Sequence, residues 1–206
     1  MPAQIALPLD MPGRDTPSRI VVGNANLGAI EACQQTEGWP FRTAILFGPA
    51  RSGKSLLARW FAESGAGEAV DDADRMDETA LFHRWNRAQE SATPLLLTAT
   101  TPADGRAWEV SLPDLGTRLR AALRLDITAP DDAMMEELIA LHAEARALSL
   151  SPDGCHYLAS RSERSHLGAE TLVATVDRLS LERKMAPGLS IWREAVEEVS
   201  GSAGPA

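Results

Sequence analysis

The sequence lacks the features that define several protein classes. Its two cysteines, Cys33 and Cys155, are far apart and belong to no cluster with the spacing of metal ligands, so we expect two buried or inert thiols. Its longest apolar runs are too short to span a bilayer, so no membrane partner is expected. The N-terminus has no basic flank and carries Asp10 within its apolar stretch, unlike a signal peptide, which favours a cytoplasmic location.

Basic residues are also in the minority. The 20 lysines and arginines are outnumbered by 29 acidic residues, for a net charge of −9. A protein that grips DNA through many phosphates usually has a basic face, so the acidic excess argues against strong autonomous DNA binding. A local basic strip remains open, because Arg118, Arg120 and Arg124 cluster in the sequence.

The apolar pattern divides the chain into an α/β part and a helical part. Strands are expected at residues 43–47, 69–70, 94–99 and 123–127, with helices at 26–34, 54–63 and 78–89. After Pro130 only helices are expected, at 131–146, 152–160, 166–182 and 191–199, and Asp131 and Ser151 are suitable N-caps. The predicted fold is a short parallel sheet flanked by helices, followed by an all-helical lid. The predicted ranges are a flexible arm (1–17), a core (18–129), a lid (130–200) and a disordered tail (201–206).

The clearest chemical signal is a phosphate-binding loop. Residues 48–55 match G-x-x-x-x-G-K-[ST] in full and lie between a predicted strand and a predicted helix. Glycines let the loop curl so that its N–H groups face phosphates, and the following helix adds its positive N-terminal end. Lys54 is expected to reach the β- and γ-phosphates and Ser55 to bind Mg²⁺, so the expected cofactors are ATP or ADP with Mg²⁺. The candidate nucleotide-binding residues are Gly48, Pro49, Ala50, Arg51, Ser52, Gly53, Lys54, Ser55 and Leu56.

Carboxylates follow the next predicted strand. Asp71 is expected to hold the magnesium shell, and Asp72 could orient an attacking water. A solvated acidic turn is the alternative, because Asp74 and Asp77 are close by. At the end of the third strand, Thr98 and Thr100 offer hydroxyls near the expected γ-phosphate, although threonine is also common at strand ends.

These elements, in this order, resemble AAA+ ATPases and specifically the DnaA branch, over about residues 20–199. Residues 20–26 are similar to the segment that packs around adenine in that branch, which implies that Val21 and Val22 lie near the base. The turn at residues 98–102 falls at the sensor 1 position. Residues 112–119 are similar to the arginine-finger box, with Arg118 at the finger position, and Arg164 resembles the sensor 2 arginine. The plainer alternatives are a surface charge or an Asp114 salt bridge for Arg118, and a lid-surface charge for Arg164.

Two departures from the DnaA pattern narrow this interpretation. The sequence ends after the lid, without the helix-turn-helix domain that DnaA carries, so origin recognition is not expected. Only residues 56–70 separate the phosphate loop from Asp71, where a family member normally fits an additional strand and helix. We therefore expect a sheet that lacks an edge strand, which puts DNA remodelling in doubt.

The N-terminal arm adds a further resemblance. Residues 4–9, Gln-Ile-Ala-Leu-Pro-Leu, resemble the peptide that docks into the bacterial sliding clamp, with Gln4 at the pocket rim and Leu7 and Leu9 inside an apolar pocket. Each buried leucine would contribute about 1.5–3 kcal/mol before the arm is ordered. A mildly apolar, disordered terminus is the alternative.

Together these features resemble the Hda family, the regulatory inactivators of DnaA. The resemblance implies a nucleoid-associated protein that sits on the DNA-loaded clamp, contacts DNA through it, and stimulates ATP hydrolysis by DnaA through Arg118. Its own hydrolysis is expected to be weak, and a homo-oligomer is possible. Two alternatives stay open: an autonomous AAA+ ATPase or loader that uses Asp72, and a non-catalytic clamp adaptor that retains ADP.

Overall fold

The computed structural model describes residues 19–101 and 108–202. Their contacts form two compact units, and each is described here by itself. One unit contains Asn26–Thr128, and the other joins residues 19–25 to the helices that follow Ala129. The predicted arm at 1–17 and the last four residues of the predicted tail lie outside the described residues.

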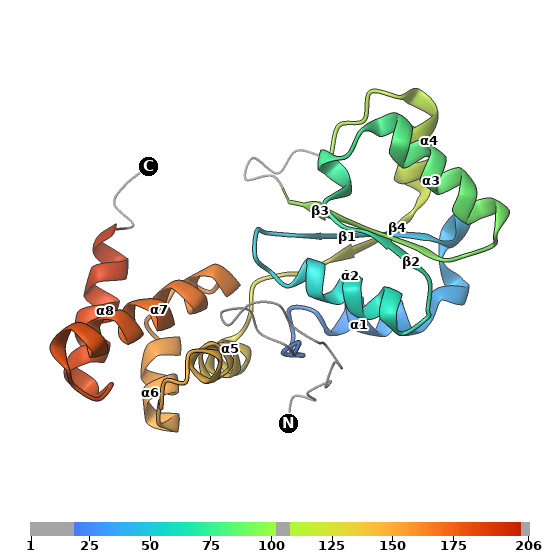
Figure 1. The fold of residues 1–206 in the computed structure, drawn as a ribbon. Helices are drawn as coiled ribbons and strands as arrows, with labels where there is room; N and C mark the ends of the chain where they lie inside the picture. Colours follow the sequence, from blue (N-terminus) through green and yellow to red (C-terminus); the bar gives the residue numbers. More distant parts are fainter. Residues whose placement is uncertain (1–18, 102–107, 203–206) are drawn as a thin grey trace. The chain divides into compact units, whose positions relative to one another are not determined.

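A parallel sheet forms the centre of the first unit (Figure 1). Its strand order is β2-β3-β1-β4, and every neighbouring pair is parallel. All six residues of β1 are buried, as continuous apolar strands in a parallel sheet usually are. No strand lies between α2 and β2 in this described stretch, as the short sequence segment predicts. The strands are β1 (Thr43–Gly48), β2 (Glu68–Val70), β3 (Leu95–Thr100) and β4 (Leu123–Asp126).

Helices cover both faces of this sheet. Figure 1 shows α3 and α4 on one face and α1 and α2 on the other. The core beneath α3 and α4 joins Ile45 and Phe47 of β1 to Leu81 and Trp85 of α3 and Leu115 of α4. These helices are α1 (Leu27–Gln34), α2 (Lys54–Glu63), α3 (Glu78–Glu90) and α4 (Pro113–Ala121), and short 3-10 turns span Thr36–Gly38, Pro40–Arg42 and Ala73–Arg75.

The helices that follow Ala129 form the core of the second unit. The helix α5 packs against α6 and α7, and α8 packs against α6 and α7. Asp131 and Ser151 are N-caps as predicted, because their side chains accept hydrogen bonds from Met134 N and Gly154 N. The helix α8 includes two residues of the predicted tail, and no helix among the described residues is long and apolar enough to cross a membrane. The bounds are α5 (Asp132–Ala145), α6 (Pro152–Ala159), α7 (His166–Arg183) and α8 (Leu189–Ser202).

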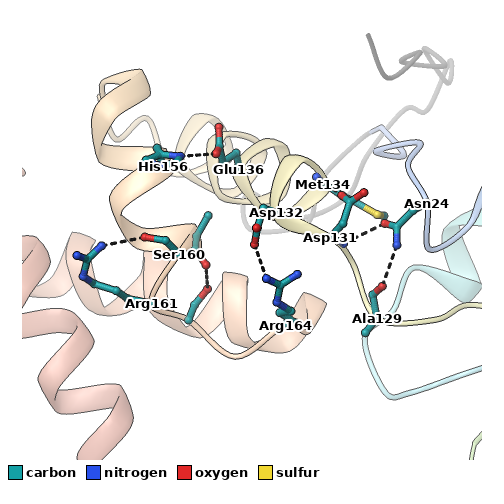
Figure 2. A network of polar contacts seen from close by, with 12 residues as sticks. Asn24, Ala129, Asp131, Asp132, Met134, Glu136, His156, Ser160, Arg161 and Arg164 are labelled. Atoms are coloured by element: carbon teal, nitrogen blue, oxygen red, sulfur yellow. Dashed lines mark hydrogen bonds and ion pairs between the residues drawn. The ribbon is translucent and has the colours of Figure 1, made fainter.

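Residues 19–25 belong to this second unit, whereas the predicted core range began at residue 18. Asn24 ties the segment to the start of α5, since its Nδ2 donates to Ala129 O and its Oδ1 accepts from Asp131 N (Figure 2). Val21 and Val22 are each 4% exposed. The segment that resembles the adenine-packing region is therefore a buried part of the unit that contains the C-terminal helices.

Candidate nucleotide-binding site

The phosphate loop leaves the carboxyl end of β1 and enters α2. Within it, Arg51 and Gly53 have left-handed backbone angles, with φ of +61° and +87°. Such left-handed residues next to right-handed ones turn successive N–H groups to one side and form a concave anion site. The N-terminus of the ten-residue α2 adds unpaired N–H groups and positive potential. The backbone alone therefore provides an anion cradle.

Close packing fixes the first residue of the loop. A Cβ atom on Gly48 would lie 2.7 Å from Ser52 Oγ and 3.1 Å from Ile127 Cβ, so a larger residue would displace the loop. Ser52 is 1% exposed, and its Oγ atom has no hydrogen-bond partner among the described residues. A buried polar atom without a partner is costly, so this hydroxyl fits a site that gains a polar ligand.

The Lys54 ammonium lies over the loop itself. Its Nζ donates to Gly48 O at 2.9 Å and to Pro49 O at 2.7 Å, and the residue is only 5% exposed. Burial lowers the pKa of Lys54 below its ordinary value, while the negative charges of Asp72, Asp71 and Asp74 act in the opposite direction. Phosphate oxygens would be stronger partners for this ammonium than the neutral carbonyls that hold it here.

The structure brings the predicted carboxylates and Thr98 together. Thr98 is fully buried; its Oγ1 donates to Asp71 Oδ1 at 2.6 Å and accepts from Asp72 N at 2.9 Å. This contact forms because β2 and β3 are parallel neighbours, so their carboxyl ends meet at one edge of the sheet. Asp72 adopts a left-handed conformation, with φ of +47°. Thr98 is therefore the residue that holds the acidic turn, while its proximity to a γ-phosphate remains a prediction.

Thr100 lies beside the phosphate loop. It pairs with Gly48 across β3 and β1, and Thr101 N donates to Gly48 O at 3.0 Å. The N–H of Thr100 donates to Asp74 Oδ2 at 3.1 Å, while Asp74 Oδ1 is buried without a hydrogen-bond partner in the described structure. From the sequence, Asp74 was expected only as part of a solvated acidic turn. Its contact with Thr100 depends on the register of two strands, which no local motif encodes.

Arg118 is held against α3 within the first unit. Its guanidinium lies 4.7 Å from the centre of the Phe82 ring and 4.2 Å from that of Trp85. Its Nη1 donates to Asn86 Oδ1 at 2.6 Å, so this hydrogen bond joins α4 to α3 and does not go to Asp114. Cation–π contacts of this kind contribute about 0.5–2 kcal/mol each, depending on their desolvation. The candidate finger is thus a packed side chain.

The rest of the expected basic strip is also engaged within the chain. The guanidinium of Arg124 makes hydrogen bonds to both carboxylate oxygens of Asp126 and lies 4.3 Å from the centre of the Phe47 ring. Arg120 Nη2 donates to Thr117 Oγ1 at 3.2 Å. The Asp126 carboxylate offsets the charge of Arg124, so the strip presents less positive charge to a nucleic acid.

Arg164 belongs to the second unit, at the turn before α7. Its Nη2 forms an ion pair with Asp132 Oδ1 at 2.7 Å, in the first turn of α5 (Figure 2). Both side chains are more than half exposed, so the pair adds little to stability. The contact of Arg164 with a nucleotide remains a prediction, as does that of Val21 and Val22 with adenine. The clamp-binding candidates Gln4, Leu7 and Leu9 lie outside the described residues.

Comparison with solved structures decides the fold. The chain matches domain III of the replication initiation protein DnaA from Thermotoga maritima with a TM-score of 0.69 at 13% identity, over 87% of this chain and 94% of that one. It matches the RuvB Holliday junction branch migration motor of the same organism with a TM-score of 0.60 at 17% identity, over 86% and 69% of the two chains. A DNA replication initiation factor matches with a TM-score of 0.58 at 15% identity, over 80% of this chain and 65% of that one.

The chain has a DnaA-like AAA+ fold. The predicted fold class, a parallel sheet with flanking and C-terminal helices, is confirmed. No protein-family model and no curated protein sequence matches the chain. The similarity is therefore one of three-dimensional structure at low sequence identity.

Within this AAA+ fold, the residues at the loop suit a nucleotide with magnesium. Among residues 19–101 and 108–202, no group of three or more His, Cys, Asp or Glu side chains is arranged to hold a metal by itself. Mg²⁺ commonly takes one or two protein oxygens and completes its shell with phosphate oxygens and water. The Ser55 hydroxyl and the Asp71 carboxylate are suitable protein ligands, and Leu56 follows Ser55 in the first turn of α2. When bound, the nucleotide would supply the phosphoryl group and Mg²⁺ would offset its charge.

Proposed function

We propose that this protein is a regulatory AAA+ protein that binds ADP or ATP with Mg²⁺. The observation that carries the proposal is the phosphate loop between β1 and α2, with Lys54 Nζ folded over it and Ser52 Oγ buried without a hydrogen-bond partner in the part of the chain that the structure describes. A phosphate oxygen would be a stronger acceptor for Lys54 Nζ than the two carbonyls and would give Ser52 Oγ an acceptor that it lacks. The Asp71–Thr98 pair supplies an oriented carboxylate where β2 ends beside β3.

Calorimetric titration with ADP and ATP, with and without Mg²⁺, tests this step. Lys54→Ala is expected to abolish or strongly weaken binding, while Lys184→Gln, at the chain's other lysine, is expected to leave it unchanged. If the intact protein gives neither heat nor a thermal shift at about 1 mM nucleotide, nucleotide binding is excluded, and the regulatory proposal fails with it.

We further propose that the protein is tethered to the DNA sliding clamp. The support is the resemblance of Gln4, Leu7 and Leu9 to the clamp-binding peptide. A pull-down with the clamp should capture the intact protein but not the double variant Gln4→Ala/Leu7→Ala. Single-site affinity should be weak and should rise when several sites of the clamp ring are available. Equal capture of the two proteins would exclude this peptide as the tether.

On the clamp, the protein would stimulate ATP hydrolysis by DnaA, with Arg118 as the finger. An arginine that meets transition-state charge contributes about 10³–10⁵ in rate. Mixing the protein with clamp, DNA and ATP-bound DnaA should accelerate ADP production, and Arg118→Ala should remove the acceleration. Arg120→Ala, two residues further along α4, is the matched control. Failure of the intact protein to accelerate hydrolysis would end this part of the proposal.

One observation favours a second candidate function, a clamp-tethered adaptor that does not activate DnaA. The guanidinium of Arg118 is occupied by Phe82, Trp85 and Asn86 of its own chain. To act as a finger it must leave or extend beyond these contacts. Tightly retained ADP together with unchanged DnaA hydrolysis would identify the adaptor, whereas turnover by the protein alone that Lys54→Ala removes would indicate an autonomous ATPase.

A further inference from the structure

Arg51 occupies a backbone position that normally favours glycine. Of the two left-handed residues in the phosphate loop, Gly53 has no Cβ atom and adopts φ of +87° without strain, but Arg51 adopts +61° with a long side chain. Left-handed angles are uncommon for residues other than glycine, asparagine and aspartate. Residues held in such conformations cluster at sites where they bind or react. A functional role for the Arg51 side chain would explain why an arginine, and not a glycine, occupies this position.

The charges around the loop indicate what that role is. The negative charges of Asp71, Asp72 and Asp74 all act on Lys54, together with the positive charge of Arg75, so carboxylates outnumber cations around this ammonium. A nucleotide would add its own negative charge to this edge. Arg51 is the other cationic residue of the loop; it is exposed and lies three positions before Lys54. A guanidinium can offer two parallel N–H groups to phosphate oxygens.

We infer that Arg51 is a second phosphate-binding cation of the loop. Its backbone N–H belongs to the curled loop, and its guanidinium binds oxygens of the polyphosphate from the solvent side, while Lys54 binds them from the buried side. The contact with phosphate offsets the cost of the left-handed backbone angle. This inference rests on the proposed binding of nucleotide and assigns the side chain of one loop residue to it.

Three substitutions separate the guanidinium from the backbone. Arg51→Asn removes the charge but tolerates a left-handed angle, Arg51→Gly removes both charge and strain, and Arg51→Lys keeps the charge. Arg59→Gln, at an exposed arginine of α2, is the matched control. Calorimetry gives the Kd of ADP and ATP with Mg²⁺ for each protein at low and high salt, and thermal melting without nucleotide reports the strain.

Arg51→Asn and Arg51→Gly should raise the Kd about tenfold at low salt, as expected for a lost charge-assisted hydrogen bond. Arg51→Lys keeps the charge but not the two parallel N–H groups, so its Kd should lie between those of the original protein and Arg51→Asn. Arg59→Gln should stay within about threefold of the original value, and the differences should shrink at about 0.5 M salt. Without nucleotide, Arg51→Asn and Arg51→Gly should melt no lower than the original protein.

The other outcomes overturn the inference in distinguishable ways. If Arg51→Asn binds nucleotide as tightly as the original protein, the guanidinium makes no phosphate contact, but the proposed nucleotide binding stands. The same conclusion follows if only Arg51→Gly is weak, because added loop flexibility then explains the loss. If the original protein binds no nucleotide, the proposed function itself fails, and this inference fails with it.

Discussion

The substitution Thr98→Val tests how the acidic turn is held, because valine has nearly the same shape as threonine but lacks the hydroxyl. Thr98 lies in β3 and is fully buried, and the strand residues on either side of it, Leu97 and Ala99, are also fully buried. Sequence preference and burial alone would therefore favour valine, which is apolar and common in strands. Two hydrogen bonds oppose that substitution, to Asp71 Oδ1 at 2.6 Å and from Asp72 N at 2.9 Å.

The size of the effect follows from the two partners. The Asp71 side chain is exposed, so water can replace much of what its carboxylate loses. The N–H of Asp72 points at the buried Oγ1 atom in a partly buried contact, and a donor left unpaired there costs at most about 1–3 kcal/mol. We therefore expect Thr98→Val to lower the free energy of unfolding by about 1–3 kcal/mol. For a domain of about 100 residues, each kcal/mol lowers Tm by about 4–8 °C.

Denaturant unfolding of Thr98→Val and of Thr98→Ser measures this effect. Serine keeps the hydroxyl and loses one methyl group, which should cost about 0.8 kcal/mol. A double-mutant cycle with Asp71→Ala should show a coupling of about 0.5–3 kcal/mol between the two side chains. A Thr98→Val protein as stable as the original, or more stable, would show that the hydroxyl does not hold the acidic turn.

Three further predictions concern other parts of the chain. Gly48→Ala should lower the free energy of unfolding by about 1–3 kcal/mol and weaken nucleotide binding, because the added Cβ meets Ser52 and Ile127. Gly28→Ala in α1 has open space around the added Cβ and should leave stability unchanged or raise it in the same melting and titration assays. Hydrogen bonds from Ser111 N and Leu112 N lower the pKa of Glu78. The stability that these bonds contribute is therefore present above the ordinary carboxyl range and is lost as pH falls through the lowered pKa. The Tm difference between the original protein and Glu78→Gln should be largest near neutral pH and should shrink below about pH 4. Burial raises the pKa of the Cys33 thiol to about 12, so a thiol reagent at about pH 8 should modify it only after unfolding, and rapid modification of the native protein would contradict the structure.

Periodicity and local motifs predict most of the fold. The helix at residues 54–63 has its predicted bounds, and the helices and strands expected elsewhere have bounds within about three residues of those observed. These elements are predictable because their apolar spacing or their caps lie within one segment, as with Asp131 at the start of α5. The helix α4 was not among the predicted elements, because residues 112–119 were interpreted only as similar to a finger box. Pro113 lies in the first turn of this helix, and Gly116 lies within it.

Contacts that depend on tertiary packing were not predictable from the sequence. The bond between Asp74 and Thr100 spans 26 residues and requires β2 and β3 to be neighbours in a fixed register. The stacking of Arg118 on Phe82 and Trp85 joins two helices that no sequence pattern places together. The segment 19–25 was placed in the predicted core range, but Asn24 joins it to the start of α5. No sequence motif around Asn24 predicts these hydrogen bonds.

The short connection between the phosphate loop and the acidic turn explains how Asp71 is positioned although no strand lies between α2 and β2. After α2 only four residues precede β2, so the chain must turn sharply at the sheet edge. A Cβ atom on Gly67 would lie 2.3 Å from Pro94 O and 2.8 Å from the Phe61 ring, so only glycine allows the chain to approach β3 this closely. Glu68 N then donates to Pro94 O at 2.8 Å and sets the register of the three-residue strand. That register determines which residue of β3 meets Asp71, and so a glycine outside the phosphate loop places the carboxylate beside Thr98.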